Sequence, residues 1–426
     1  MKNNPAKIYK RDLRAAINKY LAKPEILAIK GPRQAGKTTF LKTLQQELSS
    51  KSKTIFITFE DREKLDIFEQ DIQNFIKLFV APYETVFIDE FQYAKDGGQK
   101  LKYLFDTTST KFIISGSSSL ELTFQTGKYL VGRIFSFYLM PFNFNEFIEV
   151  REPELAKLLD IKRKSTMKLI QGESNKLSHG NHIKSHELQS RVLKLLEEYI
   201  IYGGYPRVIV AGDEEEKRTI LKEIINNYLL YDIKGLLELV TSDKLLLLAK
   251  ALALQIGNLV EYQELGILSG LGQIEIKKHL RILRETYILE LISPYFSNKR
   301  TELVKNPKVY FTDPGIRHSL LNNFSKFMDR SDKGALLENY VHQSLRQHTE
   351  LKFWRTKSQA EVDFVIERAG ELLPIEVKIN KKTIGKSLHS FIVKYKPKTA
   401  IVVTLGESKK EVVGKTIVYF IPAYYL

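Results

Sequence analysis

The chain has 426 residues, of which 43% are hydrophobic and 27% charged, a composition typical of a soluble globular protein with two or three domains. It has no cysteine, which excludes disulfides, thiolate zinc sites and cysteine nucleophiles and is consistent with a reducing cytoplasm. No apolar run is long enough to cross a bilayer and no secretory signal is evident, so we expect a cytoplasmic protein without a membrane partner. The formal net charge of +16 favours a polyanionic partner such as DNA.

The first motif follows a predicted strand at residues 25–30 and precedes a predicted helix. Gly31, Gly36, Lys37 and Thr38 fill the pattern G-x-x-x-x-G-K-[ST]. In such a loop the backbone N–H groups point at phosphate oxygens, the lysine reaches the β- and γ-phosphates, and the hydroxyl binds Mg²⁺. We therefore predict that the ATP-binding residues are Gly31, Pro32, Arg33, Gln34, Ala35, Gly36, Lys37, Thr38 and Thr39.

A second motif, "TVFIDEF" at residues 85–91, ends a predicted strand with two acids. Asp89 suits the coordination shell of Mg²⁺, and Glu90 suits a general base that polarises the attacking water. Together the two motifs predict ATP hydrolysis, with ATP and Mg²⁺ as cofactors.

Two further residues are candidates for this ATPase site. The strand predicted at 111–115 ends in small polar residues and, in ATPases of this class, lies between the two motif strands, where Ser117 would sense the γ-phosphate. The alternative is a loop without a function. Arg133 lies between apolar residues and suits an arginine finger, acting on its own nucleotide or a neighbour's, or else a structural ion pair.

Predicted strands recur near 25–30, 53–59, 84–88, 111–115 and 133–139, with helical stretches between most of them. This alternation predicts an α/β fold with a parallel sheet, and hence a P-loop ATPase core over residues 1–145.

Residues 146–240 predict a helical lid that contains a polar segment at 172–189. Its histidines at 179, 182 and 186 favour a solvated loop over a metal site, because the segment is polar and no cysteine accompanies them.

Residues 241–325 predict a winged helix-turn-helix that binds DNA. A helix at 261–268 and a second at 274–286 flank a glycine-bearing turn, and the second helix separates an apolar face from a basic one. The apolar positions are Ile276, Leu280, Leu283 and Ile288, and the basic ones are Lys277, Lys278, Arg281 and Arg284. The segments "YILELISPYF" and "KVYFTD" would pair as the wing, with Lys299 and Arg300 at its tip. The alternative is a plain helical hairpin with a solvated basic face.

Residues 326–426 predict a helix, a hairpin that turns at Gly370, a second helix and a strand. Glu338, Asp363 and Glu376 are of the residue type that holds Mg²⁺ or Mn²⁺ against a scissile phosphate, and Lys378 would activate the attacking water. Glu376 and Lys378 share one face of their strand at a spacing of two. The alternative is a module in which ion pairs stabilise the hairpin and the fold only grips nucleic acid.

The chain resembles bacterial and archaeal AAA-type ATPases whose C-terminal domain of unknown function has a restriction-endonuclease-like PD-(D/E)xK fold. The resemblance covers nearly the whole chain and rests on the ordered segments "GPRQAGKTT", "VFIDEFQ", "ISGSSS", "GGYP", "KVYFTDPGI", "LLENYV", "WRTKSQAEVDFVI" and "PIEVK". It implies an ATPase with Lys37, Thr38, Asp89 and Glu90 at its site. It also implies nuclease-type residues at Glu338, Asp363, Glu376 and Lys378, with activity either retained or lost.

Overall fold

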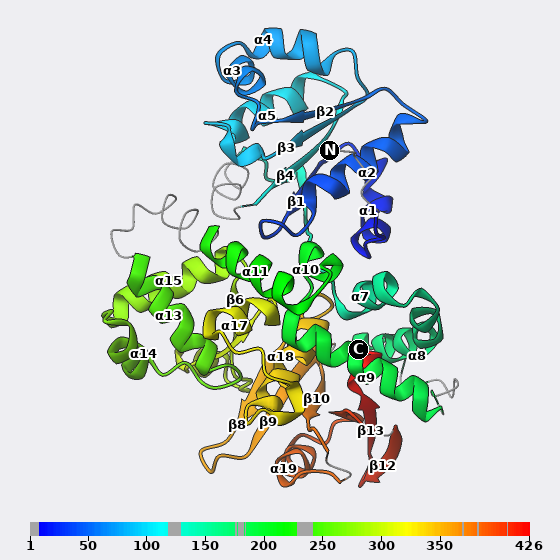
Figure 1. Cartoon of the computed structure of the whole chain (residues 1–426), viewed down its shortest axis with the longest axis vertical. Coiled ribbons are helices and arrows are strands. Elements are labelled where there is room, and N and C mark those ends of the chain that lie inside the picture. Colours follow the sequence, from blue (N-terminus) through cyan, green and yellow to red (C-terminus); the bar gives the residue numbers. More distant parts are fainter. Residues whose placement is uncertain are drawn as a thin grey trace. The chain divides into compact units, whose positions relative to one another are not determined.

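The computed structural model describes residues 8–117, 129–174, 177, 183, 185–227, 242–368, 370–380, 383–406 and 408–426. The chain divides into two compact units (Figure 1). The first comprises Met1–Phe142 with Glu285–Tyr287, and the second Asn143–Arg284 with Ile288–Leu426. The first unit thus ends close to the boundary predicted at 145. None of the described helices has the length and apolar character needed to span a membrane.

The first unit is built on a five-stranded sheet in the order β2-β3-β4-β1-β5, in which all neighbouring strands run parallel. Its strands are β1 (Ile26–Lys30), β2 (Thr54–Thr58), β3 (Thr85–Asp89), β4 (Lys111–Gly116) and β5 (Ile134–Tyr138). Its helices are α1 (Leu13–Leu21), α2 (Lys37–Ser49), α3 (Arg62–Gln70), α4 (Ile72–Phe75), η1 (Ile76–Val80), η2 (Phe91–Tyr93) and α5 (Gly97–Thr107). The parallel α/β core is confirmed, and β4 lies between β1 and β3 as predicted.

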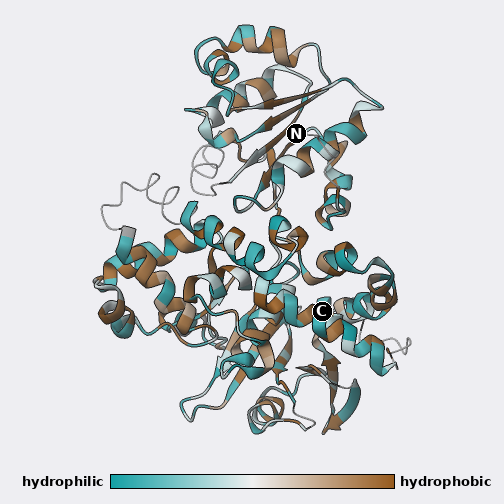
Figure 2. Ribbon diagram, viewed as in Figure 1, coloured by the Kyte–Doolittle hydropathy of each residue, from teal (hydrophilic) through white to brown (hydrophobic). Residues whose placement is uncertain are grey.

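Two apolar clusters form the core of this unit. Alternate residues of β1 enter different clusters, Ile26 and Ala28 one and Leu27 and Ile29 the other, because successive side chains of a strand point to opposite faces. The strands appear as continuous hydrophobic ribbons in Figure 2. Burial of the central strands β1, β3 and β4 on both faces explains why the sequence shows apolar runs there, whereas the edge strands β2 and β5 are less buried.

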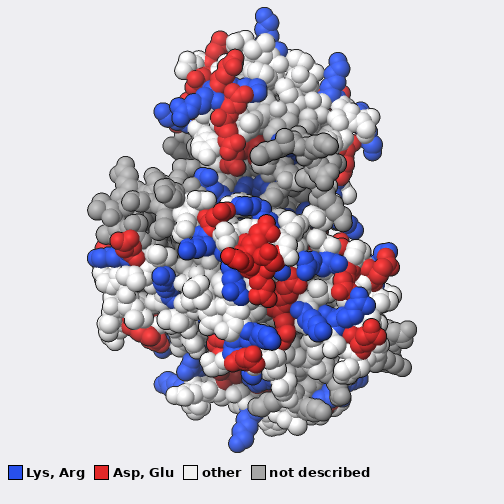
Figure 3. Space-filling model, in the orientation of Figure 1, with Lys and Arg blue, Asp and Glu red and all other residues white. Residues whose placement is uncertain are grey.

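The N-terminal part of the second unit is helical, as predicted for a lid. Its helices are α7 (Phe144–Arg151), α8 (Pro153–Gln171), α9 (His186–Tyr202), α10 (Pro206–Val210), α11 (Glu214–Ile225) and α13 (Ser242–Leu254). The first turn of α11 carries Glu214, Glu215 and Glu216, and acidic side chains gather over this helix in Figure 3, so the positive net charge is not evenly spread. His186 begins α9, whereas His179 and His182 lie outside the described residues.

The glycine pair of "GGYP" closes on a buried aspartate from a distant part of the chain. The backbone N–H of Gly204 donates to Asp313 Oδ2 at 2.8 Å, and Asp313 also begins α17 (Pro314–Leu321). Gly203 has φ +76°, and a Cβ there would lie 2.1 Å from Asp313 Oδ1. Only glycine fits that position without displacing the carboxylate.

The predicted helix pair is present as α14 (Tyr262–Ser269) and α15 (Gln273–Glu285). The four apolar positions predicted for the core, at 276, 280, 283 and 288, are all buried. The strands β6 (Leu289–Ile292) and β7 (Lys308–Phe311) pair antiparallel. Their connection contains the helix α16 (Lys299–Val304), so Lys299 and Arg300 begin a helix rather than forming a tight wing tip. The Asn298 side chain, which accepts the N–H of Arg300 at 3.0 Å, starts this helix.

The C-terminal part is a six-stranded sheet in the order β12-β13-β11-β10-β9-β8. Its elements are α18 (Lys333–Leu345), β8 (Lys352–Arg355), β9 (Glu361–Arg368), β10 (Glu371–Val377), α19 (Lys386–Tyr395), β11 (Thr399–Thr404), β12 (Lys409–Val413) and β13 (Thr416–Pro422), with the short helices η4 (Phe327–Asp329) and η5 (Ala423–Tyr425). The hairpin β9–β10 turns at Gly370, which has φ +79°. The predicted helix, hairpin, second helix and strand are present as α18, β9–β10, α19 and β11, whereas β8, β12 and β13 were not predicted.

Candidate nucleotide site and carboxylate cluster

The phosphate loop joins β1 to α2 and takes its shape from residues with unusual backbone angles. Gly36 has φ +94° and Gln34 φ +60°. A Cβ at Gly31 would lie 2.1 Å from the carbonyl oxygen of Leu139, so this position admits only glycine. The N–H groups that follow open the first turn of α2, which is where a phosphate binds best.

Lys37 is buried and folds back onto its own loop. Its Nζ donates to the carbonyl oxygens of Gly31 and Pro32 at 3.1 and 2.9 Å. Burial lowers the pKa of the Lys37 ammonium to about 8, against the opposing attraction of Glu90 and Asp89. An anionic phosphate beside this ammonium would raise the pKa again and favour the charged form further.

Arg11, which the sequence analysis did not identify, supports the phosphate loop through hydrogen bonds. Arg11 donates through Nη1 to the carbonyl oxygen of Ala35 at 3.1 Å and through Nη2 to that of Met140 at 2.6 Å. Its guanidinium also lies 4.3 Å from the centroid of the Phe142 ring. No motif marks Arg11, because its role depends on contacts with residues far along the chain.

Asp89 ends β3 beside the phosphate loop. The Thr38 hydroxyl donates to Asp89 Oδ2 at 2.6 Å, and the Ser115 hydroxyl, from the neighbouring strand β4, donates to Asp89 Oδ1. Hydroxyl and carboxylate oxygens are the hard donors that Mg²⁺ prefers, so Thr38 and Asp89 fit this ion. The contact of Ser115 with Asp89 was not predicted. Its position near the carboxyl end of β4, beside the strand that ends at Asp89, could have indicated it.

Glu90 is held in a strained conformation with φ +53° and ψ +42°, a region that non-glycine residues rarely adopt. Gln92 donates through Nε2 to Glu90 Oε2 and also contacts the Ser117 hydroxyl at 3.1 Å. Ser117, predicted as a γ-phosphate sensor, lies 3.5 Å from Glu90 Oε2. The structure therefore places Ser117 beside the predicted base, and Gln92 is a positioning residue that sequence reasoning missed.

Arg133 does not approach this site within its own chain. It precedes β5, whose Ile134 pairs with Ile26 at the start of β1, whereas the phosphate loop follows Lys30 at the other end. Its Nε instead forms an ion pair with Asp106 Oδ1 at 2.8 Å. A finger acting in cis is thus wrong, because parallel strands place the two residues at opposite edges of the sheet. A finger acting on a neighbour's nucleotide stays a prediction.

The carboxylates of the C-terminal region surround a lysine that sequence analysis did not select. The Nζ of Lys308 lies 3.1 Å from Glu338 Oε1 and 2.6 Å from Glu361 Oε1. The Tyr310 hydroxyl donates to the same oxygen of Glu338. Burial alone would lower the pKa of Lys308, but Glu338 and Glu361 outweigh it and raise that pKa above its usual value. The lysine is therefore a fixed cation within the cluster.

Asp363 lies at the edge of this cluster. Burial, and after it the Glu338 carboxylate, raise the pKa of Asp363 to about 7. Its Oδ2 accepts the backbone N–H of Val377 at 2.6 Å. Glu376 forms the predicted pair with Lys378, at 3.2 Å. The other oxygen of Glu376 is buried without a hydrogen-bond partner in the structure.

The predicted metal site is not assembled as expected. Within the described part of the chain, no group of three or more histidine, aspartate and glutamate residues is arranged to hold a metal ion. Glu338 instead pairs with Lys308 and accepts a hydrogen bond from the Tyr310 hydroxyl, and a ligand set of Glu338, Asp363 and Glu376 stays a prediction. Binding by Asp363 and Glu376 alone stays a prediction. The signal for Lys308 was its spacing of two from Tyr310 in "KVYFTD", which puts both on one face of a strand.

The segment that contains the candidate nucleotide site matches a known protein-family model. Residues 23–148 match the family model described as AAA domain. The first unit is thus similar to AAA domains over the segment that contains the phosphate loop, Asp89 and Glu90. Residues 193–326 and 333–426 match two models described as domains of unknown function, DUF8612 and DUF4143.

Sequence similarity to other proteins extends over most of the chain. An uncharacterised protein of Methanocaldococcus jannaschii is 25% identical over 91% of this chain and 81% of its own length. Uncharacterised proteins of Haemophilus influenzae and Mycobacterium tuberculosis are 25% and 23% identical over 83% and 94% of this chain and 82% and 81% of their own lengths.

Solved structures give weaker matches. The ORC2 protein of Aeropyrum pernix, in its ADPNP–ADP complexes, aligns with a TM-score of 0.35 at 14% identity, over 72% of this chain and 91% of that one. AMPPCP-bound DnaA of Aquifex aeolicus aligns with a TM-score of 0.29 at 14% identity, over 64% and 86%. Superpositions at these scores add nothing to the family match.

Proposed function

We propose that the chain is an ATPase that hydrolyses ATP with Mg²⁺ at the phosphate loop of residues 31–39. The observation that carries this proposal is the convergence of Thr38 and Ser115 on Asp89 beside the buried Lys37. The parallel sheet brings these residues together because the carboxyl ends of β1, β3 and β4 share one edge.

Each residue has a defined task in this proposal. Thr38 and Asp89 would hold Mg²⁺, which when bound neutralises charge on the phosphates. Lys37 would leave the carbonyls of Gly31 and Pro32 and bind the β- and γ-phosphates. Glu90, oriented by Gln92 and Ser117, would accept a proton from the attacking water.

The test is phosphate release from ATP by the full chain. We expect Glu90→Gln to lower turnover at least about 100-fold while nucleotide binding persists, because only the base is lost. Lys37→Met should weaken binding itself. Lys42→Met is the matched control, since Lys42 is exposed on the same helix and should leave turnover unchanged. Wild-type turnover by Glu90→Gln would refute the assigned base.

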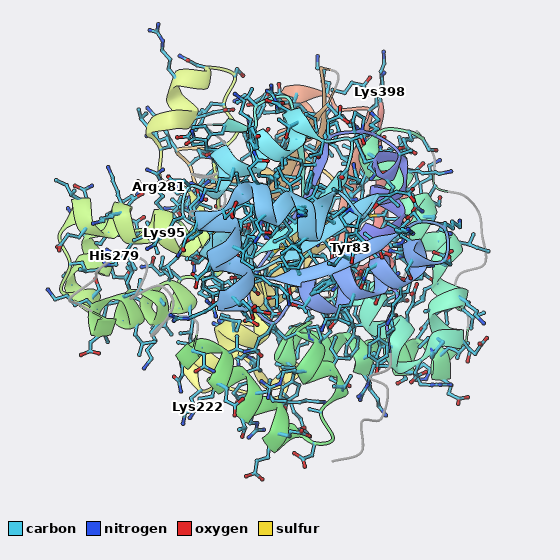
Figure 4. All side chains as sticks on the ribbon, turned by 90° about the horizontal axis from the view of Figure 1, so that it is seen from above. Tyr83, Lys95, Lys222, His279, Arg281 and Lys398 are labelled. Atoms are coloured by element: carbon cyan, nitrogen blue, oxygen red, sulfur yellow. The ribbon has the colours of Figure 1, made fainter. Side chains whose placement is uncertain are left out.

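We propose further that α15 binds duplex DNA, and a specific observation favours this second function. Ile276, Leu280 and Leu283 are buried, whereas Lys277, Lys278, Arg281 and Arg284 are exposed, so the exposed side of α15 is predominantly basic, with Ile274 and Glu275 exposed in its first turn. His279 and Arg281, which are labelled in Figure 4, belong to the two faces of the helix. The His279 side chain is 3% exposed, whereas Arg281 is exposed. A basic helix that follows a short turn is suited to the major groove.

Titration of labelled duplex DNA at several salt concentrations tests this function. We expect the double variant Lys277→Glu and Arg281→Glu to weaken binding and to flatten its salt dependence, because each lost phosphate contact lowers the slope by about one. Lys250→Glu, an exposed lysine on α13, is the control. Unchanged DNA affinity in the double variant would leave α15 as a plain helical hairpin.

For the C-terminal region, the cluster around Lys308 favours the alternative of a catalytically silent, nuclease-like module within a nucleotide-switched DNA-binding regulator. Its Glu338 carboxylate is occupied by an internal cation, and only Asp363, Glu376 and Lys378 remain for metal chemistry. The test is incubation of single- and double-stranded DNA with the full chain, ATP and Mn²⁺. Cleavage that Asp363→Asn abolishes would restore the nuclease hypothesis.

A further inference from the structure

A pocket of about 840 Å³ opens beside the C-terminal sheet, well away in sequence from the phosphate loop. It lies between the edge strand β8, the end of α19 and the connection between β6 and β7. Its aromatic lining consists of Phe296, Phe353, Trp354 and Tyr395. Phe353 and Trp354 are 1% and 3% exposed and form the floor, whereas Phe296 and Tyr395 are only partly buried. The pocket thus offers aromatic surface to a ligand.

The rim of the pocket is basic. Lys305, Lys357 and Lys394 line it and are exposed, and Arg355 joins them from β8. No aspartate or glutamate is among the described residues that line the pocket. Arg355 is partly neutralised by Glu361 at 3.3 Å, so the lysines dominate the local potential. A neutral or cationic ligand would gain nothing from this rim.

The aromatic floor is already organised. The Trp354 indole N–H donates to the Tyr395 hydroxyl at 3.2 Å, and the two rings lie edge to face with centroids 6.1 Å apart. The Nζ of Lys394 lies 5.0 Å from the centroid of the Tyr395 ring, so a cation and an aromatic surface are presented side by side. The aromatic side chains of the floor therefore need little further ordering when a ligand binds, which favours affinity.

We propose that this aromatic–basic pocket binds single-stranded nucleic acid. Bases stack on aromatic side chains while lysines contact the phosphates, and a single strand exposes both groups at once. A duplex keeps its bases stacked internally and offers only phosphates. The volume of about 840 Å³ lies in the range of small-molecule pockets, which suits one or two nucleotides of the strand. This inference does not depend on ATP hydrolysis or on duplex binding by α15.

The chain supplies its own reporter, because Trp354 is its only tryptophan. The experiment is titration of the full chain with a ten-residue oligothymidylate at low salt, following the emission of Trp354 and the anisotropy of a labelled strand together. We expect quenching of Trp354 that saturates with the anisotropy and weakens as salt rises. No quenching at strand concentrations up to about 100 μM, the weak end of the usual range of non-specific dissociation constants, would overturn the proposal.

Variants localise the effect. Lys305→Glu combined with Lys357→Glu should weaken binding at least tenfold, and Phe296→Leu about tenfold through lost stacking. Lys410→Glu, an exposed lysine on β12, is the matched control and should bind as the wild type does. The substituted lysines are exposed, so the fold should persist, and a circular-dichroism melt checks this. Binding that survives the double charge reversal would overturn the proposal.

Three further ligands separate related chemistries. Duplex of the same length should raise anisotropy through α15 with little change in Trp354 emission. Thymidine monophosphate as effective as the ten-residue strand would mean a mononucleotide site and would overturn the strand assignment. Polyglutamate that quenches Trp354 equally well would show an acidic-peptide site instead.

Discussion

The substitution Lys308→Met tests the role of the internal cation most directly. Methionine keeps the length and the apolar stem of lysine but removes the ammonium, which leaves Glu338 without a cation and Glu361 with Arg355 as its remaining ion-pair partner. Removing one partner of a buried ion pair costs about 3–5 kcal/mol. The side chains of Glu338 and Glu361 are 14% and 26% exposed, so water and protons relieve part of this cost. We therefore expect a loss of about 3 kcal/mol at pH 8, and less at pH 5, where a carboxylate takes up a proton.

The assay is urea unfolding followed by the emission of Trp354, which lies in the second unit and so reports that unit alone. Lys410→Met serves as the control and should change the free energy of unfolding by less than about 0.5 kcal/mol. We also expect Mn²⁺ to stabilise Lys308→Met but not the wild type, because the freed carboxylates regain a cation. The reasoning is refuted if Lys308→Met loses less than about 1 kcal/mol at pH 8, or if wild type and variant respond equally to Mn²⁺.

Three further predictions concern buried groups and the first unit. Burial lowers the pKa of His318 to about 3, so the stability it contributes is present above the unfolded-state value of about 6.5 and is lost as pH falls. Unfolding at pH 7 and 4.5 should differ by about 2–3 kcal/mol more in the wild type than in His318→Phe, and equal differences would contradict this. Gly203→Ala should lose more than about 2 kcal/mol through its positive φ and the clash with a buried carboxylate, whereas Gly334→Ala, with open space around its Cβ, should be neutral or stabilising. Arg133→Ala and Asp106→Ala should both retain wild-type ATP turnover, because their partly exposed ion pair lies at the far edge of the sheet; a selective loss of about 1,000-fold in Arg133→Ala alone would establish a finger in trans.

The sequence predicted local chemistry better than long-range contacts. The strands of the first unit were located to within about two residues, because strands buried on both faces are apolar runs with sharp ends. The motif residues Lys37, Thr38 and Asp89 meet as predicted, since their positions in a parallel sheet follow from the order of strands. Lys308 and Arg11 were missed because each acts on residues distant in sequence, and the spacing of two between Lys308 and Tyr310 indicates a shared strand face but not the glutamate that both contact.

The hairpin β9–β10, which carries Asp363 and Glu376, shows the same limit of prediction from sequence. The pairing of Glu376 with Lys378 followed from a strand spacing of two and is present. Glu338, on α18, lies close enough to raise the pKa of Asp363, but its Oε1 also lies 3.1 Å from Lys308, on a strand from an earlier part of the chain, and this contact was not predicted. The alternation of side chains along one hairpin predicts which of its own residues share a face. It does not predict that Lys308, from β7, lies beside Glu338.

Arg11 has a practical consequence for the choice of protein fragments. The family match begins at residue 23, yet this arginine anchors two carbonyl groups on either side of the nucleotide pocket. A shortened protein that starts at the family boundary would retain every motif residue and still lack the anchor. Its phosphate loop would lack this support, so weak nucleotide binding by such a fragment would reflect the truncation and would say nothing about the full chain.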